Sequence, residues 1–269
     1  MTHTTIDIGI QDGVAVLTFN RPKLLNAFNT ALVRDVGDGM KELSANDDVR
    51  AIVVRGAGRA FSAGFDLKES AASAGERSPA EWRSLLEADF RFIMSFWDCP
   101  KPTIAAVHGY CIGGAFELSL ACDVTVAAAG TLFGSPEVKF GSGAVALLLP
   151  WIAGPKAAKE LLLTGNDKLS AERAQQLGIV NHVVPDGKEF ETAVAIARDM
   201  ASAAREAVRL TKLALNRTYE VMGMKAALEA ALETDILIES GGGAERAEFD
   251  RIRREQGLQA ALMWRNARR

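Results

Sequence analysis

The spacing of apolar positions predicts alternating strands and helices along the first two thirds of the chain. Short apolar runs rich in β-branched residues, each followed by a turn or a helix breaker, predict strands. These runs lie at 14–19, 51–54, 103–107, 124–127 and 179–184. Apolar residues at helical spacing predict helices at about 30–43 and 78–97, from about 113, and between 170 and 178. From residue 188 to residue 269 the pattern is almost entirely helical.

The helix that begins near residue 78 has clear signals at both ends. Ser78 is expected to cap it, with Pro79 at the first helical position and Glu81 reaching back to the cap. Pro100 and Pro102 end it. The preceding segment, residues 68–77, is rich in Ala, Ser and Glu without periodicity, and predicts a mobile surface loop.

Strands that alternate with helices, followed by helices alone, predict an α/β fold with a helical appendage. We expect a core at 1–200 that carries the active site and a helical region at 201–269 that serves oligomerisation, docked as one unit. The helix expected at 224–238 has a broad apolar face. This face can pack on the core or on another subunit, and the sequence leaves the choice open.

Composition narrows the possible functions. The 269 residues are 48% hydrophobic and carry a formal charge of −3, which favours a globular protein and disfavours a nucleic-acid partner. The cysteines Cys99, Cys111 and Cys122 lack metal or redox spacing and predict buried free thiols. The sequence shows neither a signal peptide nor a membrane span, so the cytoplasm is the expected location. Metal-ligand spacings and nucleotide motifs are also missing from the sequence, and His108 is expected to be a satisfied side chain at a strand end.

The most informative residues are two glutamates, each of which follows a glycine-bearing loop. Glu117 comes shortly after Gly113-Gly114, and Glu137 follows Phe-Gly-Ser-Pro. Each alone is more typical of a helix start or a turn, but two carboxylates in one pocket can share a water and serve as base and acid. The free N–H groups at Gly114 and at Phe65, in a second loop, can together bind one carbonyl oxygen.

These residues lie in sequence blocks that resemble the enoyl-CoA hydratase/isomerase, or crotonase, superfamily. The similarity runs in order over about residues 5–215, and its blocks are 20–28, 58–68, 105–118, 133–137 and 174–181. The resemblance implies a spiral of ββα repeats with a C-terminal helical trimerisation region, assembled as a homotrimer or homohexamer. It also implies an acyl-CoA thioester as substrate, with no cofactor beyond the coenzyme A of that substrate.

The resemblance also assigns site residues. It implies that Phe65 and Gly114 bind the thioester oxygen through their backbone N–H groups, and that Glu117 and Glu137 are the two glutamates of the hydratases. Coenzyme A is then expected near five residues of the first two blocks, namely Lys23, Arg59, Ala63, Leu67 and Lys68. The segment after Glu137, the bulky Phe65 and the charged tail at 241–256 depart from the usual pattern and leave the acyl preference open.

The presence of both glutamates favours hydration of a 2-enoyl-CoA as the reaction. In this interpretation Glu117 activates the water and Glu137 protonates the α-carbon. Three other chemistries of the superfamily remain as alternatives, namely Δ3-Δ2-enoyl-CoA isomerisation, acyl-CoA hydrolysis and decarboxylation. A catalytically silent acyl-CoA-binding scaffold is a further alternative from another class.

Overall fold

A computed structural model describes residues 3–67, 69 and 77–268. Its larger sheet has six strands in the order β1-β2-β3-β4-β6-β9, in which β1 and β2 are antiparallel and the other neighbours are parallel. A smaller sheet has the order β5-β7-β8. The strands are β1 (Ile6–Gln11), β2 (Val14–Phe19), β3 (Ala51–Gly56), β4 (Thr103–Val107), β5 (Tyr110–Ile112), β6 (Val124–Ala128), β7 (Leu132–Gly134), β8 (Leu169–Ser170) and β9 (His182–Val184).

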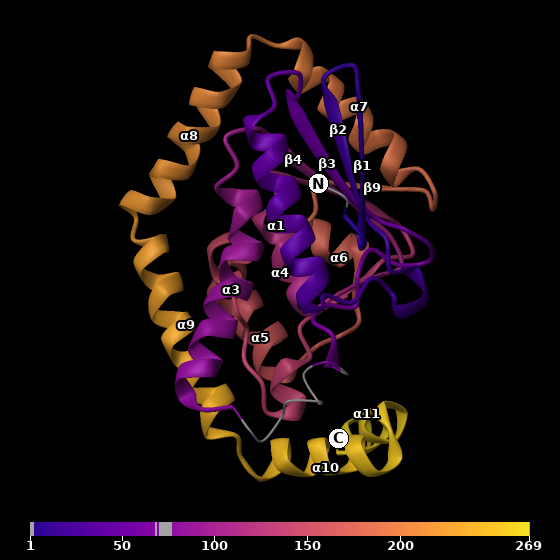
Figure 1. The fold of residues 1–269 in the computed structure, drawn as a ribbon, viewed down its shortest axis with the longest axis vertical. Coiled ribbons are helices and arrows are strands. Elements are labelled where there is room, and N and C mark those ends of the chain that lie inside the picture. The colour runs from indigo at the N-terminus through magenta and orange to yellow at the C-terminus, as the bar shows by residue number, and fades with distance from the viewer. Residues whose placement is uncertain (1–2, 68, 70–76, 269) are drawn as a thin grey trace.

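The helices connect these strands and then continue alone to the C-terminus (Figure 1). They are α1 (Thr30–Ala45), α3 (Pro79–Trp97), α4 (Gly114–Ala121), α5 (Leu149–Thr164), α6 (Ala171–Gln176), α7 (Glu189–Ser202), α8 (Arg205–Val221), α9 (Met224–Gly241), α10 (Ala244–Gln256) and α11 (Leu258–Ala267), with 3₁₀ turns η1 (Pro22–Leu24) and η2 (Glu137–Phe140).

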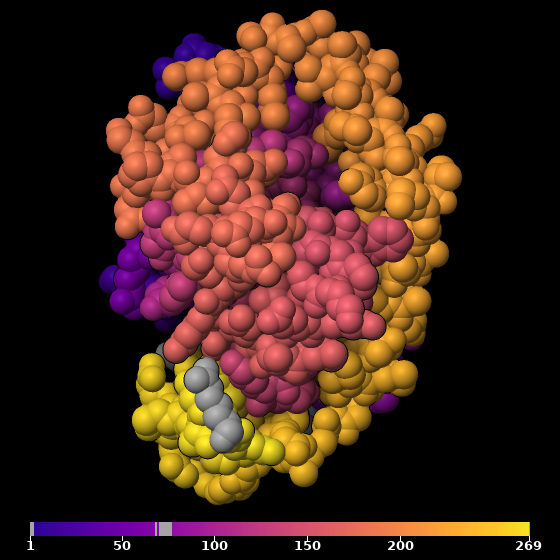
Figure 2. Space-filling view, turned by 180° about the vertical axis from the view of Figure 1, so that it is seen from behind, coloured from indigo at the N-terminus to yellow at the C-terminus, as the bar shows by residue number. Residues whose placement is uncertain are grey.

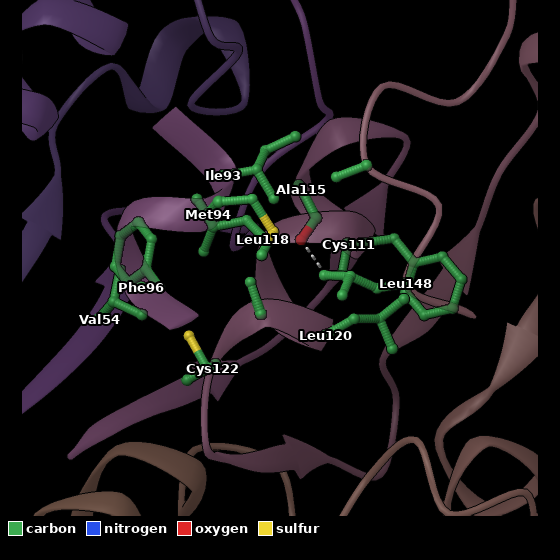
Figure 3. Close-up of a cluster of buried hydrophobic side chains, with 14 of the residues drawn as sticks. Val54, Ile93, Met94, Phe96, Cys111, Ala115, Leu118, Leu120, Cys122 and Leu148 are labelled. Carbon is green, nitrogen blue, oxygen red and sulfur yellow. Dashed lines mark hydrogen bonds between the residues drawn. The ribbon is translucent and has the colours of Figure 1, made fainter. Parts of the chain in front are cut away.

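The larger sheet is buried on both faces, which explains why its central strands are apolar throughout. Along β3, Ala51 and Val53 point towards α7 and share a cluster with Ala193 and Ala197 of that helix. Ile52 and Val54 point the other way, into the main core formed with α1, α3 and α4. Figure 3 shows part of this core around α4, where the buried thiol of Cys111 bonds the carbonyl of Ala115 at 3.3 Å.

The C-terminal helices cover one side and one end of the core. Helices α8 and α9 run along one side of the molecule beside α3, and α10 and α11 form one end of it (Figures 1 and 2). On α9, Met224, Leu228, Leu232 and Ile236 are buried in the main core. The apolar face of this helix therefore packs on its own chain, which settles the question that the sequence left open.

The structure confirms the α/β class, the helical tail, the Ser78 capping box and the free cysteines. It adds several elements that the sequence did not predict, namely β1, β5, β7, β8 and α5. The edge strand β1 is half polar, and β5, β7 and β8 have at most three residues each, so they carry little periodicity. The strand predicted at 179–184 begins only at His182.

Two expectations stay predictions. The division at residue 200 is not tested, and the predicted loop at 68–77 lies outside the described residues except for Glu69 and Arg77. No helix within the described ranges combines the length and the apolar character needed to cross a membrane.

A buried lysine attaches α8 to the core. The Nζ of Lys212, a residue that is 7% exposed, donates to the carbonyls of Phe96 at 3.2 Å and Lys101 at 3.1 Å. It also pairs with Asp123 at 2.7 Å. Because Asp123 in turn accepts from the backbone N–H and the hydroxyl of Thr103, this single ammonium joins α8 to the segments that flank β4.

We expect Lys212→Met to lower the free energy of unfolding by about 3 kcal/mol, since it leaves a carboxylate and two carbonyls without their donor. Urea unfolding monitored by circular dichroism measures this change. The control is Lys159→Met, at an exposed lysine of α5, which should alter stability by less than about 0.5 kcal/mol. Equal effects of the two substitutions would contradict the role of Lys212.

Candidate active site

Strand β5 is followed directly by α4, and the turn between them has a backbone conformation that only glycine adopts readily. Gly113 has φ +62°, and a Cβ at this position would lie 2.5 Å from Oε1 of Glu137. The turn thus permits Glu137 to approach the backbone at the start of α4. It also places the first N–H group of that helix, from Gly114, beside the carboxylates.

A second loop meets this helix start. Phe28 N–H donates to the Gly64 carbonyl at 2.8 Å and Asp66 N–H to the Phe28 carbonyl at 3.0 Å, so the N–H of Phe65 between them remains unused. A Cβ at Gly64 would lie 3.2 Å from the Gly114 nitrogen, which shows how closely the loops approach. Neither Phe65 N–H nor Gly114 N–H has a protein acceptor among the described residues. Two free donors therefore stand side by side, as an oxyanion requires.

Glu117 lies in the first turn of α4 and is 5% exposed. Its carboxylate accepts from Val145 N–H at 3.2 Å and from Ala146 N–H at 2.8 Å. Burial raises its pKa well above the usual range and the charge of Glu137 raises it further, while the two N–H groups oppose the shift. These bonds orient the side chain and favour its ionised form.

Glu137 begins the turn η2, directly after β7, and its half-buried carboxylate opens into the cavity. The hydroxyl of Ser135 donates to its Oε2 at 2.6 Å. Burial raises the pKa of Glu137 to about 7, although the Ser135 hydroxyl lowers it. Repulsion opposes ionisation of both glutamates together, so burial and repulsion both favour a protonated form of the pair.

The two glutamates and the two free N–H groups line one cavity of about 1010 Å³. Lys23, Arg59, Ala63 and Leu67 line it as well. Lys68, the fifth residue expected near coenzyme A, lies outside the described residues. The carbonyl of Leu67 already accepts from Arg253 of α10 at 2.7 Å, which leaves it one lone pair for a ligand. Helices α10 and α11 thus form part of the cavity wall, which the sequence did not predict.

The sequence reasoning also missed two acidic side chains. Asp89 of α3 lines the cavity, and Asp235 of α9 lies against Gly143, which lines it too. Burial raises the pKa of Asp89 to about 8 and that of Asp235 to about 7. Each aspartate interrupts an otherwise apolar helix face, and this interruption is the signal that could have identified both.

His108 lies away from the cavity wall. Its Nε2 is 3.0 Å from the carbonyl oxygen of Gly58 and its Nδ1 is 3.8 Å from Glu189, in agreement with a satisfied side chain at a strand end. Among the side chains that the structure describes, no group of three His, Cys, Asp or Glu is arranged to hold a metal ion.

Comparison with known proteins identifies the family. The model of the enoyl-CoA hydratase/isomerase family matches residues 9–239. The chain belongs to the enoyl-CoA hydratase/isomerase family. A probable enoyl-CoA hydratase from Mycobacterium bovis is 35% identical over 233 residues, which are 82% of this chain and 84% of the relative. A short-chain-enoyl-CoA hydratase from Clostridium acetobutylicum is 34% identical over 223 residues, 81% of this chain and 82% of the relative.

A solved structure extends the likeness to the C-terminus. The crystal structure of an enoyl-CoA hydratase/isomerase from Xanthobacter autotrophicus Py2 is 46% identical, with a TM-score of 0.97. The match covers 100% of this chain and 99% of that one. The family and its relatives confirm the crotonase fold and make this chain an enzyme.

The buried aspartates predict a stability that falls with rising pH. Asp89 and Asp235 keep their protons up to about pH 8 and 7 in the folded chain, and lose them near pH 4 when unfolded. Between these values the folded state binds more protons, so stability is greatest at low pH and is lost as pH rises through 7 and 8. We expect the free energy of unfolding to fall by about 2 kcal/mol or more from pH 5.5 to 8.5.

Urea unfolding across this pH range measures the effect, and Asp89→Asn should flatten the profile. The matched control is Glu87→Gln on the same helix, because Glu87 pairs with Arg83 at 3.6 Å and with Arg91 at 3.7 Å outside the cavity. An unchanged slope in Asp89→Asn would show that Asp89 carries no such proton.

Proposed function

We propose that the enzyme adds water across the double bond of a 2-enoyl-CoA thioester and forms the 3-hydroxyacyl-CoA. One observation carries the proposal: two carboxyl groups lie in the same cavity as two unused backbone N–H donors. Both curated relatives described above are named as hydratases. A hydratase needs a base for the water, an acid for the α-carbon and stabilisation of the enolate oxygen, and the cavity offers all three.

The environments of the glutamates suggest how the roles divide. The N–H groups of Val145 and Ala146 stabilise the carboxylate form of Glu117 against the burial that raises its pKa, and we assign it the role of base. Glu137, with a pKa of about 7, can hold the proton that the α-carbon receives. As water oxygen bonds to the β-carbon, its proton passes to Glu117 and Glu137 protonates the α-carbon. The pair keeps one proton, now on Glu117.

In this proposal the thioester oxygen lies between the N–H groups of Phe65 and Gly114. Negative charge builds up on that oxygen during the addition, and preorganised donors in a site shielded from water stabilise it strongly. The coenzyme A moiety would contact Lys23 and Arg59 with its phosphates, and the backbone near Ala63 and Leu67 with its adenine. Coenzyme A enters only as part of the substrate, and the proposed reaction needs no other cofactor.

We also propose the trimer or hexamer that the resemblance implies. Helices α8 and α9 and the turn between them carry large apolar side chains that are exposed in the single chain, among them Leu215 at 59%, Val221 at 89%, Met222 at 64% and Leu237 at 72%. Exposed apolar residues in this number along adjacent helices support burial against other subunits.

Replacing either glutamate should abolish hydration. We expect Glu117→Gln and Glu137→Gln each to lower kcat/KM by about 100-fold or more, because each loses one proton transfer in the transition state. The measurement is the loss of ultraviolet absorbance of short-chain 2-enoyl-CoA thioesters, with the addition of one water verified by mass. Glu172→Gln, at an exposed glutamate of α6, is the matched control and should keep the full rate.

The same variants separate the alternatives. A Δ3-Δ2 isomerase needs a single proton shuttle, so Glu117→Gln would then keep most of its activity on 3-enoyl substrates. A full hydration rate in Glu137→Gln would refute the proposed acid.

The rate should also report the protonation of Glu137. Because Glu137 acts as the acid, kcat/KM falls as pH rises through about 7. The hydroxyl of Ser135 lowers this pKa, so Ser135→Ala should move the alkaline limb to higher pH by about one unit. Ser95→Ala, whose hydroxyl bonds only the carbonyl of Phe92 within α3, is the control. A limb that stays in place or moves to lower pH would contradict the contact with Ser135.

A further inference from the structure

Asp89 and Asp235 interrupt the buried faces of two helices that pack on each other. On α3, Asp89 lies three residues after Leu86, which also lines the cavity. On α9, Asp235 lies between Leu232 and Ile236, and both of these are buried in the core. A leucine at either aspartate would continue the apolar face without burying a carboxyl group. Burying these two carboxyl groups costs free energy, so apolar packing does not explain why the aspartates are there.

Asp89 makes no hydrogen bond within the described ranges, and Asp235 meets only the backbone N–H of Gly143. Asp89 is 8% exposed, faces the cavity and makes no hydrogen bond there. Asp235 is 2% exposed, and neither of its carboxyl oxygens makes a well-aligned hydrogen bond. Its Oδ1 lies where a side chain on Gly143 would be, at the cavity wall. The carboxyl group of Asp89 thus offers acceptors that no described residue uses.

The neighbouring arginines, Arg246 and Arg77, make no hydrogen bond with either aspartate among the described residues. The guanidinium of Arg246 is taken by Glu239 at 2.6 Å and Asp250 at 3.4 Å. The guanidinium of Arg77 lies over the ring of Trp82 at 4.9 Å and makes no hydrogen bond with Asp89, although its charge acts on that carboxyl. Glu239 adds a further acid close to Asp89 and Asp235.

The aspartates lie near the proposed reaction centre but take no part in it. Asp235 is close enough to Glu117 and Glu137 for their charges to act on one another. With the thioester oxygen at Phe65 and Gly114 and the double bond at the glutamates, the remaining acyl group must fill the rest of the cavity. Asp89 and Gly143, which covers Asp235, line that same cavity.

We propose that the acyl group of the substrate carries a hydrogen-bond donor beyond its β-carbon, a hydroxyl or an ammonium group, which binds Asp89 and lies beside Asp235. This inference rests on the proposed function for the direction in which the acyl group runs. A hydrocarbon tail would leave the carboxyl group of Asp89 desolvated and without a partner, whereas a donor would satisfy it. A site that is built to hydrogen-bond a polar group discriminates strongly against the analogue that lacks it.

Binding to Glu137→Gln tests the proposal without turnover. The probes are trans-2-enoyl-CoA thioesters in matched pairs, such as 5-hydroxypent-2-enoyl-CoA and hex-2-enoyl-CoA, which differ by a hydroxyl in place of a methyl group. Pairs one carbon shorter and one carbon longer vary the distance between the double bond and the donor group. The trans double bond prevents lactone formation. We expect the hydroxylated member of at least one pair to bind roughly tenfold tighter in titration calorimetry.

Substitutions at Asp89 assign the preference to its carboxyl group. In the Glu137→Gln background, Asp89→Leu should reduce the preference to about onefold, and Asp89→Asn should retain part of it. Glu87→Gln, on the same helix outside the cavity, should leave it unchanged. An ammonium group in place of the hydroxyl distinguishes the two kinds of donor: tighter binding of the ammonium probe identifies a cationic acyl group, and tighter binding of the hydroxyl probe a neutral one.

The proposal is overturned if the methyl-terminated probe binds as tightly at every length, or if the preference survives Asp89→Leu. These outcomes are distinct from failure of the hydratase proposal. Binding preference without any addition of water by the unmodified enzyme would leave the inference intact and refute hydration. Hydration with equal binding of both probes would support the hydratase proposal and refute the inference about the acyl group.

Discussion

The site depends on holding two carboxyl groups together away from bulk water. Burial and mutual repulsion both raise the cost of ionising Glu117 and Glu137, and the surrounding backbone and Ser135 offset part of that cost. The glycine turn at Gly113 makes the approach of Glu137 to α4 possible, since any Cβ there would collide with the carboxylate. The same turn exposes the first N–H of the helix. One local conformation therefore permits the approach of Glu137 and leaves the N–H of Gly114 free.

The acidic character of the cavity extends beyond this pair. Asp89 and Glu239 also line it, Asp235 lies behind Gly143 at its wall, and α10 contributes Arg246 and Arg253 as compensating charges. The C-terminal helices thus do more than extend the fold, because they supply part of the cavity wall and half of the cationic residues that line it.

Much of the fold could be predicted from local patterns. The strand at 51–54 is apolar on both faces because helices cover both, and the Ser78 capping box starts a helix as its residue types require. The edge strand β1 and the short strands β5, β7 and β8 escaped prediction because pairing partners, rather than periodicity, define them. Helix α5 escaped because it bends at Gly154, before Pro155.

The sequence by itself determined the α/β order, the two glutamates behind glycine turns and the family resemblance, since these depend on residue type and short spacing. The tertiary structure alone decided that Val145 and Ala146 hold Glu117, that Ser135 bonds Glu137, and that α9 packs on its own chain. It also brought Asp89 to the cavity and Asp235, far away along the chain, to the back of its wall at Gly143. Such contacts depend on how helices pack in three dimensions, and local sequence patterns carry no record of that geometry.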